Sequence, residues 1–215
     1  MIQTNDDAIE LLRRERVMTL TPSDGFRSLV GEIVGGAVKG SWWGHPRGKD
    51  IYRIATALEA SDEVLVAKLV DGKVTFVHKA LWPALYRVVS DNAWRERINA
   101  ELSRAARQLW RRVEKVGEVR VDALPGFSSM ATRREIKCAQ REIETRAVVQ
   151  VGSAHTDRGN HIAVLRSWKR WAPQRVRAAA RRITLIDAEA ELKKAKVVIA
   201  SSLRESCARR RRGGP

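Results

Sequence analysis

Apolar residues in the first 90 positions follow a helical spacing before they switch to the alternation typical of strands. Residues 1–20 predict an amphipathic helix that ends near Met18. Residues 21–34 predict a second helix, with Thr-Pro-Ser chemistry at its start and the Gly35-Gly36 pair at its end. A third helix is expected around residues 51–58, where apolar positions again share one face.

A β-hairpin is predicted over residues 63–78. Its two apolar segments flank Asp71 and Gly72, a pair that type I′ turns prefer because glycine accepts a positive φ. A short helix is expected to follow over residues 81–88. Helices followed by a hairpin are typical of winged-helix domains and of other small α+β units, so we interpret residues 1–90 as a first winged-helix-like unit.

The second half of the sequence repeats this order more clearly. One long helix is predicted from Ile98 to Val116, because apolar residues recur at steps of three and four along it. Another helix begins at Thr132, whose hydroxyl suits an N-cap, and strands are expected over residues 147–151 and 161–166. We therefore expect residues 91–172 to form a winged-helix unit that binds nucleic acid.

A long basic helix is predicted from Pro173 onward, and the arginine-rich end of the chain is expected to be disordered. The apolar stripe of this helix, over residues 185–203, needs a partner surface in the same chain or in a second copy, which would make a homo-oligomer. The predicted fold class is therefore α+β and helix-rich, with two winged-helix-like units and a basic C-terminal segment, residues 173–215.

The distribution of charge indicates a partner for the second half. Residues 1–90 contain 12 Lys and Arg against 11 Asp and Glu, whereas residues 91–215 contain 29 against 14. A polyanion is the expected partner of such a surface, and nucleic acid is the common one. The N-terminus lacks a signal-peptide pattern, no apolar run is long enough to span a membrane, and Cys138 and Cys207 lie far apart. We expect a cytoplasmic protein.

The helix that begins at Thr132 carries the strongest functional signal. A recognition helix that enters the major groove needs donors for phosphates and base edges on its outer face. The candidate DNA-binding residues are such donors on this helix and in the loop of the following hairpin: Thr132, Arg133, Arg134, Lys137, Arg141, Arg158 and Asn160. The alternative interpretation is an ordinary solvated helix face, because Glu135, Glu142 and Glu144 are close in sequence. Structured RNA remains an alternative partner.

The segment TRREIKCAQREIETRAVVQVGSAHTDRGNHIAVLRSWKRW resembles the winged-helix unit of a bacterial family related to the AlkZ-like DNA glycosylases. Upstream, SLVGEIVGGAVKGSWWGHPRGKDIYRIATALE and KLVDGKVTFVHKALWPAL resemble the preceding part of that family, so the likeness covers residues 24–172. The resemblance implies winged-helix architecture and DNA binding. It does not imply catalysis, because those glycosylases use a Gln-x-Gln motif and Gln150-Val151-Gly152 fails at its third position.

The most unusual string in the sequence is Trp42-Trp43-Gly44-His45-Pro46. Trp42, Trp43 and His45, with Glu32 as a carboxylate that activates water, would form a candidate base pocket for a DNA-repair glycosylase. We favour a packing role instead, in which both tryptophans fill the core between two helices.

Other chemistry finds little support in the sequence. His155 and His161 could begin a metal site, but no third ligand accompanies them, so neither a metal nor a cofactor is predicted. Nucleotide-binding, dinucleotide-binding, serine-hydrolase and zinc-protease motifs are all missing from the sequence. The leading prediction is binding of double-stranded DNA, mainly through phosphates. The alternatives are a glycosylase-like enzyme and an oligomerising scaffold.

Overall fold

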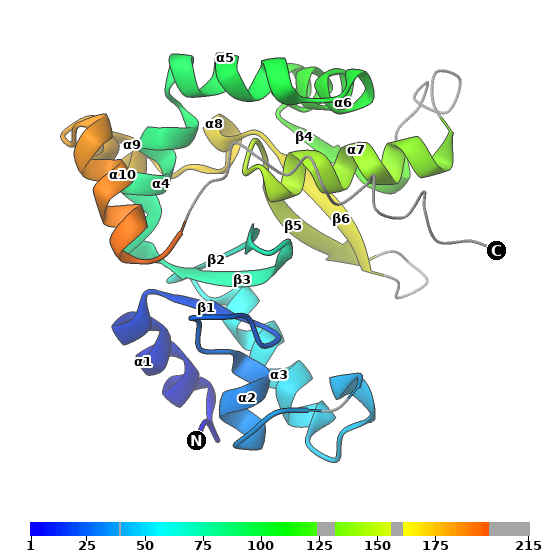
Figure 1. Ribbon diagram of the computed structural model, residues 1–215, viewed down its shortest axis with the longest axis vertical. Coiled ribbons are helices and arrows are strands. Elements are labelled where there is room, and N and C mark those ends of the chain that lie inside the picture. The colour runs from blue at the N-terminus through cyan, green and yellow to red at the C-terminus, as the bar shows by residue number, and fades with distance from the viewer. Residues whose placement is uncertain (39, 124–131, 156–160, 198–215) are drawn as a thin grey trace. The chain divides into compact units, whose positions relative to one another are not determined.

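The computed structural model describes residues 1–38, 40–123, 132–155 and 161–197. It is a helix-rich α+β structure with two small three-stranded sheets, which confirms the predicted class (Figure 1). The described chain divides into two compact units, residues 1–88 with 172–197 and residues 89–171. No helix in these described ranges is both long and apolar enough to cross a membrane.

The first unit combines helices with an antiparallel sheet whose central strand is the last of the three along the chain. Its elements are α1 (Asn5–Glu15), β1 (Val17–Thr19), α2 (Leu29–Val34), the 3-10 turn η1 (Trp42–Gly44), α3 (Gly48–Ala60), β2 (Val64–Val70) and β3 (Lys73–His78). The strand order is β1-β3-β2, and α1 and α3 pack against each other and against the strands. Leu12, Ile33, Ile54, Leu58 and Phe76 are buried in the core between them.

The hairpin predicted over residues 63–78 is confirmed. Asp71 and Gly72 have φ angles of 51° and 67°, the positive values that a type I′ turn requires at both central positions. Leu65 and Leu69, which alternate onto one face of β2, are buried. After the hairpin, η2 (Lys79–Leu81) and α4 (Trp82–Val89) supply the short helix that was expected there.

Two helix boundaries in this unit differ from the prediction. The first helix ends at Glu15 because Arg16 adopts the left-handed conformation, with φ 64°, and Met18 therefore lies in a strand. The second helix begins after Ser28, whose hydroxyl accepts a backbone hydrogen bond from the first turn. The Thr-Pro-Ser sequence at residues 21–23 does not start it.

The single long helix predicted from Pro173 is wrong for the described residues. Two helices, α9 (Gln174–Ala180) and α10 (Leu185–Lys194), occupy this segment. The second helix is restarted by Thr184, whose hydroxyl accepts a hydrogen bond from the backbone N–H of Asp187 at 3.1 Å.

The described part of the C-terminal segment belongs to the first unit, where Ala188 and Leu192 of the apolar stripe are buried. Arg16 forms an ion pair with Glu191 at 3.0 Å and so ties α10 to the start of β1. The described part of the stripe is therefore partly covered within one chain, since Leu185 and Ala195 are half-buried. The remainder of the 185–203 stripe, beyond residue 197, lies outside the described residues.

Apart from α2 in the first unit and α5 in the second, the described helices and strands of the second unit up to its hairpin follow the order of those in the first. The second unit comprises α5 (Asn92–Glu101), α6 (Arg104–Val116), β4 (Glu118–Arg120), the 3-10 turn η3 (Val121–Ala123), α7 (Arg133–Thr145), β5 (Gln150–His155), β6 (His161–Arg166) and α8 (Trp168–Trp171). The strand order is β4-β6-β5, so the last strand is again central and antiparallel to both neighbours. The series α6, β4, α7, β5, β6 thus matches the series α1, β1, α3, β2, β3.

Two predictions for the second unit also need correction. The helix expected from Ile98 to Val116 is broken, because Leu102 is extended and the Ser103 hydroxyl caps α6. Val116 is consequently exposed rather than part of the inner stripe. The strand expected at residue 147 begins only at Gln150, because Ala147 has a positive φ of 54° and turns the chain.

The C-terminal end of α7 is anchored by buried polar contacts. The guanidinium of Arg146 is buried and lies 2.6 Å from a carboxylate oxygen of Glu101. The indole N–H of Trp168 donates to the carbonyl of Ala147 at 2.6 Å. Since α6 packs directly on α7, these contacts hold the buried side of α7 against the core of the second unit.

An ion cluster around Glu63 holds α1 against the hairpin of the first unit. The Glu63 carboxylate accepts from Arg13 Nε at 3.1 Å, lies 3.1 Å from Lys79 Nζ and contacts His78 Nε2 at 3.3 Å. The hydrogen-bonded guanidinium of Arg13, followed by Lys79, lowers the pKa of Glu63 to about 2.

We expect Glu63→Gln to lower the Tm at pH 7 by roughly 2–4 °C, the range for a partly exposed ion pair in a chain of this size. Because the folded pKa lies below the usual value of 4.5, the stabilisation is complete above that value and is lost as the pH falls toward 2. Thermal unfolding from pH 7 to pH 2 tests this. Glu189→Gln, at an exposed position of α10, is the matched control. A Tm difference that persists at pH 2 would contradict the expectation.

Candidate nucleic-acid interface

The start of α7 is set by a capping box between Thr132 and Glu135. The Thr132 hydroxyl accepts from the Glu135 backbone N–H at 3.2 Å, and the Glu135 carboxylate accepts from the Thr132 backbone N–H at 2.7 Å. The same hydroxyl donates to that carboxylate at 2.9 Å. These bonds lower the pKa of Glu135, with the backbone N–H of Thr132 as the main cause. Thr132, predicted as a DNA contact, is thus engaged in starting the helix.

Three cations form a single row on the outer side of α7. Arg134, Lys137 and Arg141 are all exposed, and their spacing of three and four residues places them on one face over about 10 Å of helix. Ala139 and Ile143 are buried on the opposite side. We call Arg134, Lys137 and Arg141 the cationic row.

The acidic residues of α7 are used within the protein. Glu135 closes the capping box, Glu142 accepts from the Ser103 backbone N–H at 2.9 Å, and Glu144 is buried and accepts from Gln140 at 2.7 Å. Within the described part of the chain, no ion pair involves a member of the cationic row. These three acids were the basis of the alternative interpretation, an ordinary solvated helix face. They do not form ion pairs with the cationic row.

Several predicted residues cannot be placed. Arg158 and Asn160 lie outside the described residues, and the side chain of Arg133 does as well, although its backbone belongs to α7. His155 and His161 are partners in the backbone register of β5 and β6, but their side chains are likewise outside the description. Among the described residues no group of three metal-binding side chains occurs.

A second basic surface, which the sequence analysis missed, lies on α6. Arg104, Arg111, Arg112 and Lys115 are exposed on this helix. Its only acid, Glu114, is held by Arg95 at 3.0 Å. The sequence does indicate this basic surface, because residues 104–116 contain five Lys and Arg and only this one carboxylate.

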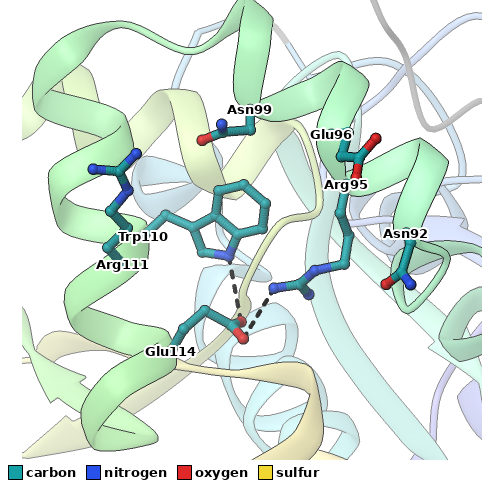
Figure 2. Close-up of a pocket in the computed structure, with 7 residues that line it drawn as sticks. All are labelled: Asn92, Arg95, Glu96, Asn99, Trp110, Arg111 and Glu114. Carbon is teal, nitrogen blue, oxygen red and sulfur yellow. Dashed lines mark hydrogen bonds and ion pairs between the residues drawn. The ribbon is translucent and has the colours of Figure 1, made fainter.

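A cavity of about 430 Å³ lies between α5 and α6 (Figure 2). The guanidinium of Arg95 covers the Trp110 ring at 4.8 Å from its centroid, and Glu114 also accepts from the Trp110 indole N–H at 3.3 Å. The remaining lining residues are Asn92, Glu96, Asn99 and Arg111. Arg95, Trp110 and Glu114 satisfy one another, so we interpret this cluster as a contact that joins the two helices.

The candidate base pocket is not assembled around Glu32. The Glu32 carboxylate is paired with Arg27 at 2.8 Å and faces a separate cavity of about 230 Å³ beside α1. The residues that line this cavity include none of Trp42, Trp43 and His45. The carboxylate is therefore committed to an ion pair rather than poised to activate water.

The two tryptophans of this turn have different environments. Trp42 is half-buried and packs against the core of the first unit, as expected for a packing residue. Trp43 is 64% exposed, so the prediction that it fills the core is wrong. His45 accepts from the Arg47 backbone N–H at 3.1 Å through Nδ1, which gives its ring a structural role in the turn.

Comparison with protein-family models, curated proteins and solved structures found no match to this chain. The resemblance to glycosylase-related winged-helix proteins therefore stays a prediction. The function of the cationic row has to be inferred from its exposure, its spacing and the engagement of the neighbouring acids.

Thr132→Ala removes the cap of α7, and we expect it to lower the free energy of unfolding by about 1 kcal/mol. Thr132→Ser keeps the hydroxyl and should retain most of the stability. Urea unfolding followed by circular dichroism measures both variants. If Thr132→Ala weakened DNA binding while leaving stability unchanged, the hydroxyl would be acting on DNA rather than on the helix.

Proposed function

We propose that this protein binds double-stranded DNA through α7, mainly by contacts with phosphates. The observation that carries the proposal is the cationic row, three exposed cations on one helix face whose neighbouring acids are engaged elsewhere. Such a face attracts phosphates because each neutralised phosphate releases condensed counterions.

The order of elements in the second unit supports a winged-helix interpretation. In this interpretation α6 and β4 precede the recognition helix α7, and the β5–β6 hairpin provides the wing. A single α-helix fits the width of the major groove, and α7 offers its cationic row on the side opposite the buried core.

The charge of the second unit also supports a polyanionic partner. Residues 89–171 contain 17 Lys and Arg against 10 Asp and Glu, while the larger first unit, residues 1–88 with 172–197, contains 19 against 14. The exposed cations of α6 extend the positive surface beyond α7. A DNA-binding function of this kind agrees with the cytoplasmic location that the sequence predicts.

The two alternative functions receive less support. A glycosylase-like enzyme would need a free carboxylate near a base pocket, and Glu32 is paired with Arg27 instead. An oligomerising scaffold would need the apolar stripe of the C-terminal segment to be open, and Ala188 and Leu192 are covered within one chain.

Changing Arg134, Lys137 and Arg141 together to Ala should weaken duplex DNA binding about tenfold or more. If all three contact phosphates, the slope of log K against log salt should become shallower by about 2.7, since each phosphate contributes about 0.9. Fluorescence anisotropy with a labelled duplex from 50 to 300 mM salt measures both effects, and duplex RNA is the comparison ligand.

The matched control removes the same charge from the first unit by changing Arg175, Arg181 and Lys193 to Ala, all at exposed positions. Circular dichroism establishes that both triple variants are folded. Equal losses in the two variants would mean that net charge, not α7, governs binding. An α7 variant with the affinity of the unmodified protein would refute the proposal, and stronger binding of duplex RNA would assign the face to RNA.

A further inference from the structure

An exposed aromatic cluster in the first unit has no role in the function proposed so far. The ring of Trp43 stacks on that of Trp42, with centroids 4.1 Å apart and planes 22° apart. The ring of Tyr52, which belongs to α3, lies 5.5 Å from the ring of Trp43, and Tyr52 is 40% exposed. We call Trp42, Trp43 and Tyr52 the aromatic platform.

The exposure of Trp43 is unusual within this protein. Trp82, Trp94, Trp110 and Trp168 are buried, and Trp42 and Trp171 are half-buried, so Trp43 is the most exposed indole among the described residues. Burial of an indole is strongly favourable, because aromatic side chains carry a large apolar area. A ring left largely in water, stacked face to face on its neighbour, is a surface suited to another flat ring.

The turn that carries the platform is held by hydrogen bonds of its own. The His45 backbone N–H donates to the carbonyl of Trp42 at 3.1 Å, and the Gly48 N–H donates to the carbonyl of His45 at 2.7 Å. A Cβ at Gly48 would lie 3.0 Å from the carbonyl oxygens of both Trp42 and Trp43, so glycine eases the close approach of turn and helix. These contacts hold the backbone of the turn on which Trp42 and Trp43 are placed.

The surroundings of the platform are cationic. Residues 42–56 contain Arg47, Lys49 and Arg53 against the single acid Asp50, and Asp50 is already paired with Arg47 at 3.2 Å. Lys49 and Arg53 are exposed on the first two turns of α3, and the guanidinium of Arg53 also donates to the side-chain oxygen of Asn5 at 3.0 Å. Stacking rings next to cations are the combination by which proteins bind unpaired bases and the phosphates that link them.

We propose that the aromatic platform stacks unpaired bases of single-stranded nucleic acid. The inference rests on the proposed function, because it takes nucleic acid as the partner of this chain. The platform lies at the start of α3, which has the same place in the first unit as α7 has in the second. A second copy of the chain fits less well, since a stable dimer buries about 800 Å² per partner and the platform exposes only two rings.

Full-length protein is titrated with labelled dT15 and with a 15-unit abasic strand that keeps the phosphates but lacks bases. Trp43→Ala should bind dT15 about 5- to 150-fold more weakly, as expected for loss of base stacking, while Trp43→Phe should retain most of the affinity. The abasic strand should bind the unmodified protein weakly and be insensitive to Trp43→Ala. Comparing dT15 with U15 distinguishes single-stranded DNA from RNA as the source of the bases.

The thermal stability and the duplex binding of Trp43→Ala are measured as controls. Because Trp43 is 64% exposed, Trp43→Ala should leave the Tm nearly unchanged, and it should bind duplex DNA like the unmodified protein. Unchanged affinity of Trp43→Ala for dT15, or equal binding of the abasic strand and dT15, would overturn the inference. So would sedimentation velocity showing self-association that depends on Trp43.

The failure of this inference and that of the proposed function are distinguishable. Normal duplex binding by the triple variant of the cationic row refutes the role of α7 and leaves the dT15 comparison intact. Loss of dT15 binding confined to Trp43→Ala supports the platform whatever the α7 variant does.

Discussion

A three-residue strand in each unit pairs with the closing strand of a hairpin more than 40 residues further along the chain, and the remaining elements are arranged around this pairing. In the second unit Val119 lies opposite Leu165, both buried, and Glu118 forms an ion pair with Arg166 at 2.5 Å. Closing so long a loop costs chain entropy, which the burial of apolar side chains offsets. Because α7 lies inside the closed loop, the same pairing restricts where its faces can point.

The orientation of α7 converts a nearly balanced sequence into a positive surface. The helix contains four cations and three acids, so its composition alone predicts little net charge. Glu135 closes the capping box, Glu142 accepts a hydrogen bond from the N-terminus of α6, and Glu144 is buried at the end of the helix. The cationic row remains exposed to water. The charge of this face therefore depends on which side chains form hydrogen bonds within the protein. A count of charges along the sequence does not show which side chains these are.

Helices and hairpins marked by turn residues, capping residues or apolar spacing could be predicted from the sequence. The breaks within two predicted helices were not predicted. The Asp71-Gly72 hairpin and the Thr132 start of α7 follow directly from turn and capping chemistry, and α3 follows from its apolar spacing. The break before Ser103 was missed because apolar spacing continues in register across it. The break before Thr184 did carry a signal, a Thr followed three residues later by an acid. Spacing also could not show that Trp43 covers Trp42 instead of the core.

The two units show how one order of elements can carry different surface chemistry. The inward positions of α3 are apolar, and those of α7 are apolar apart from Glu144, because each helix must cover its own core. The outward positions are free of that constraint: α3 presents Tyr52 beside cations, and α7 presents the cationic row. Function then resides in the side chains placed on the scaffold rather than in the scaffold itself. On this argument the smaller net charge of the first unit does not count against a nucleic-acid partner, because stacking on bases depends on exposed rings more than on net charge.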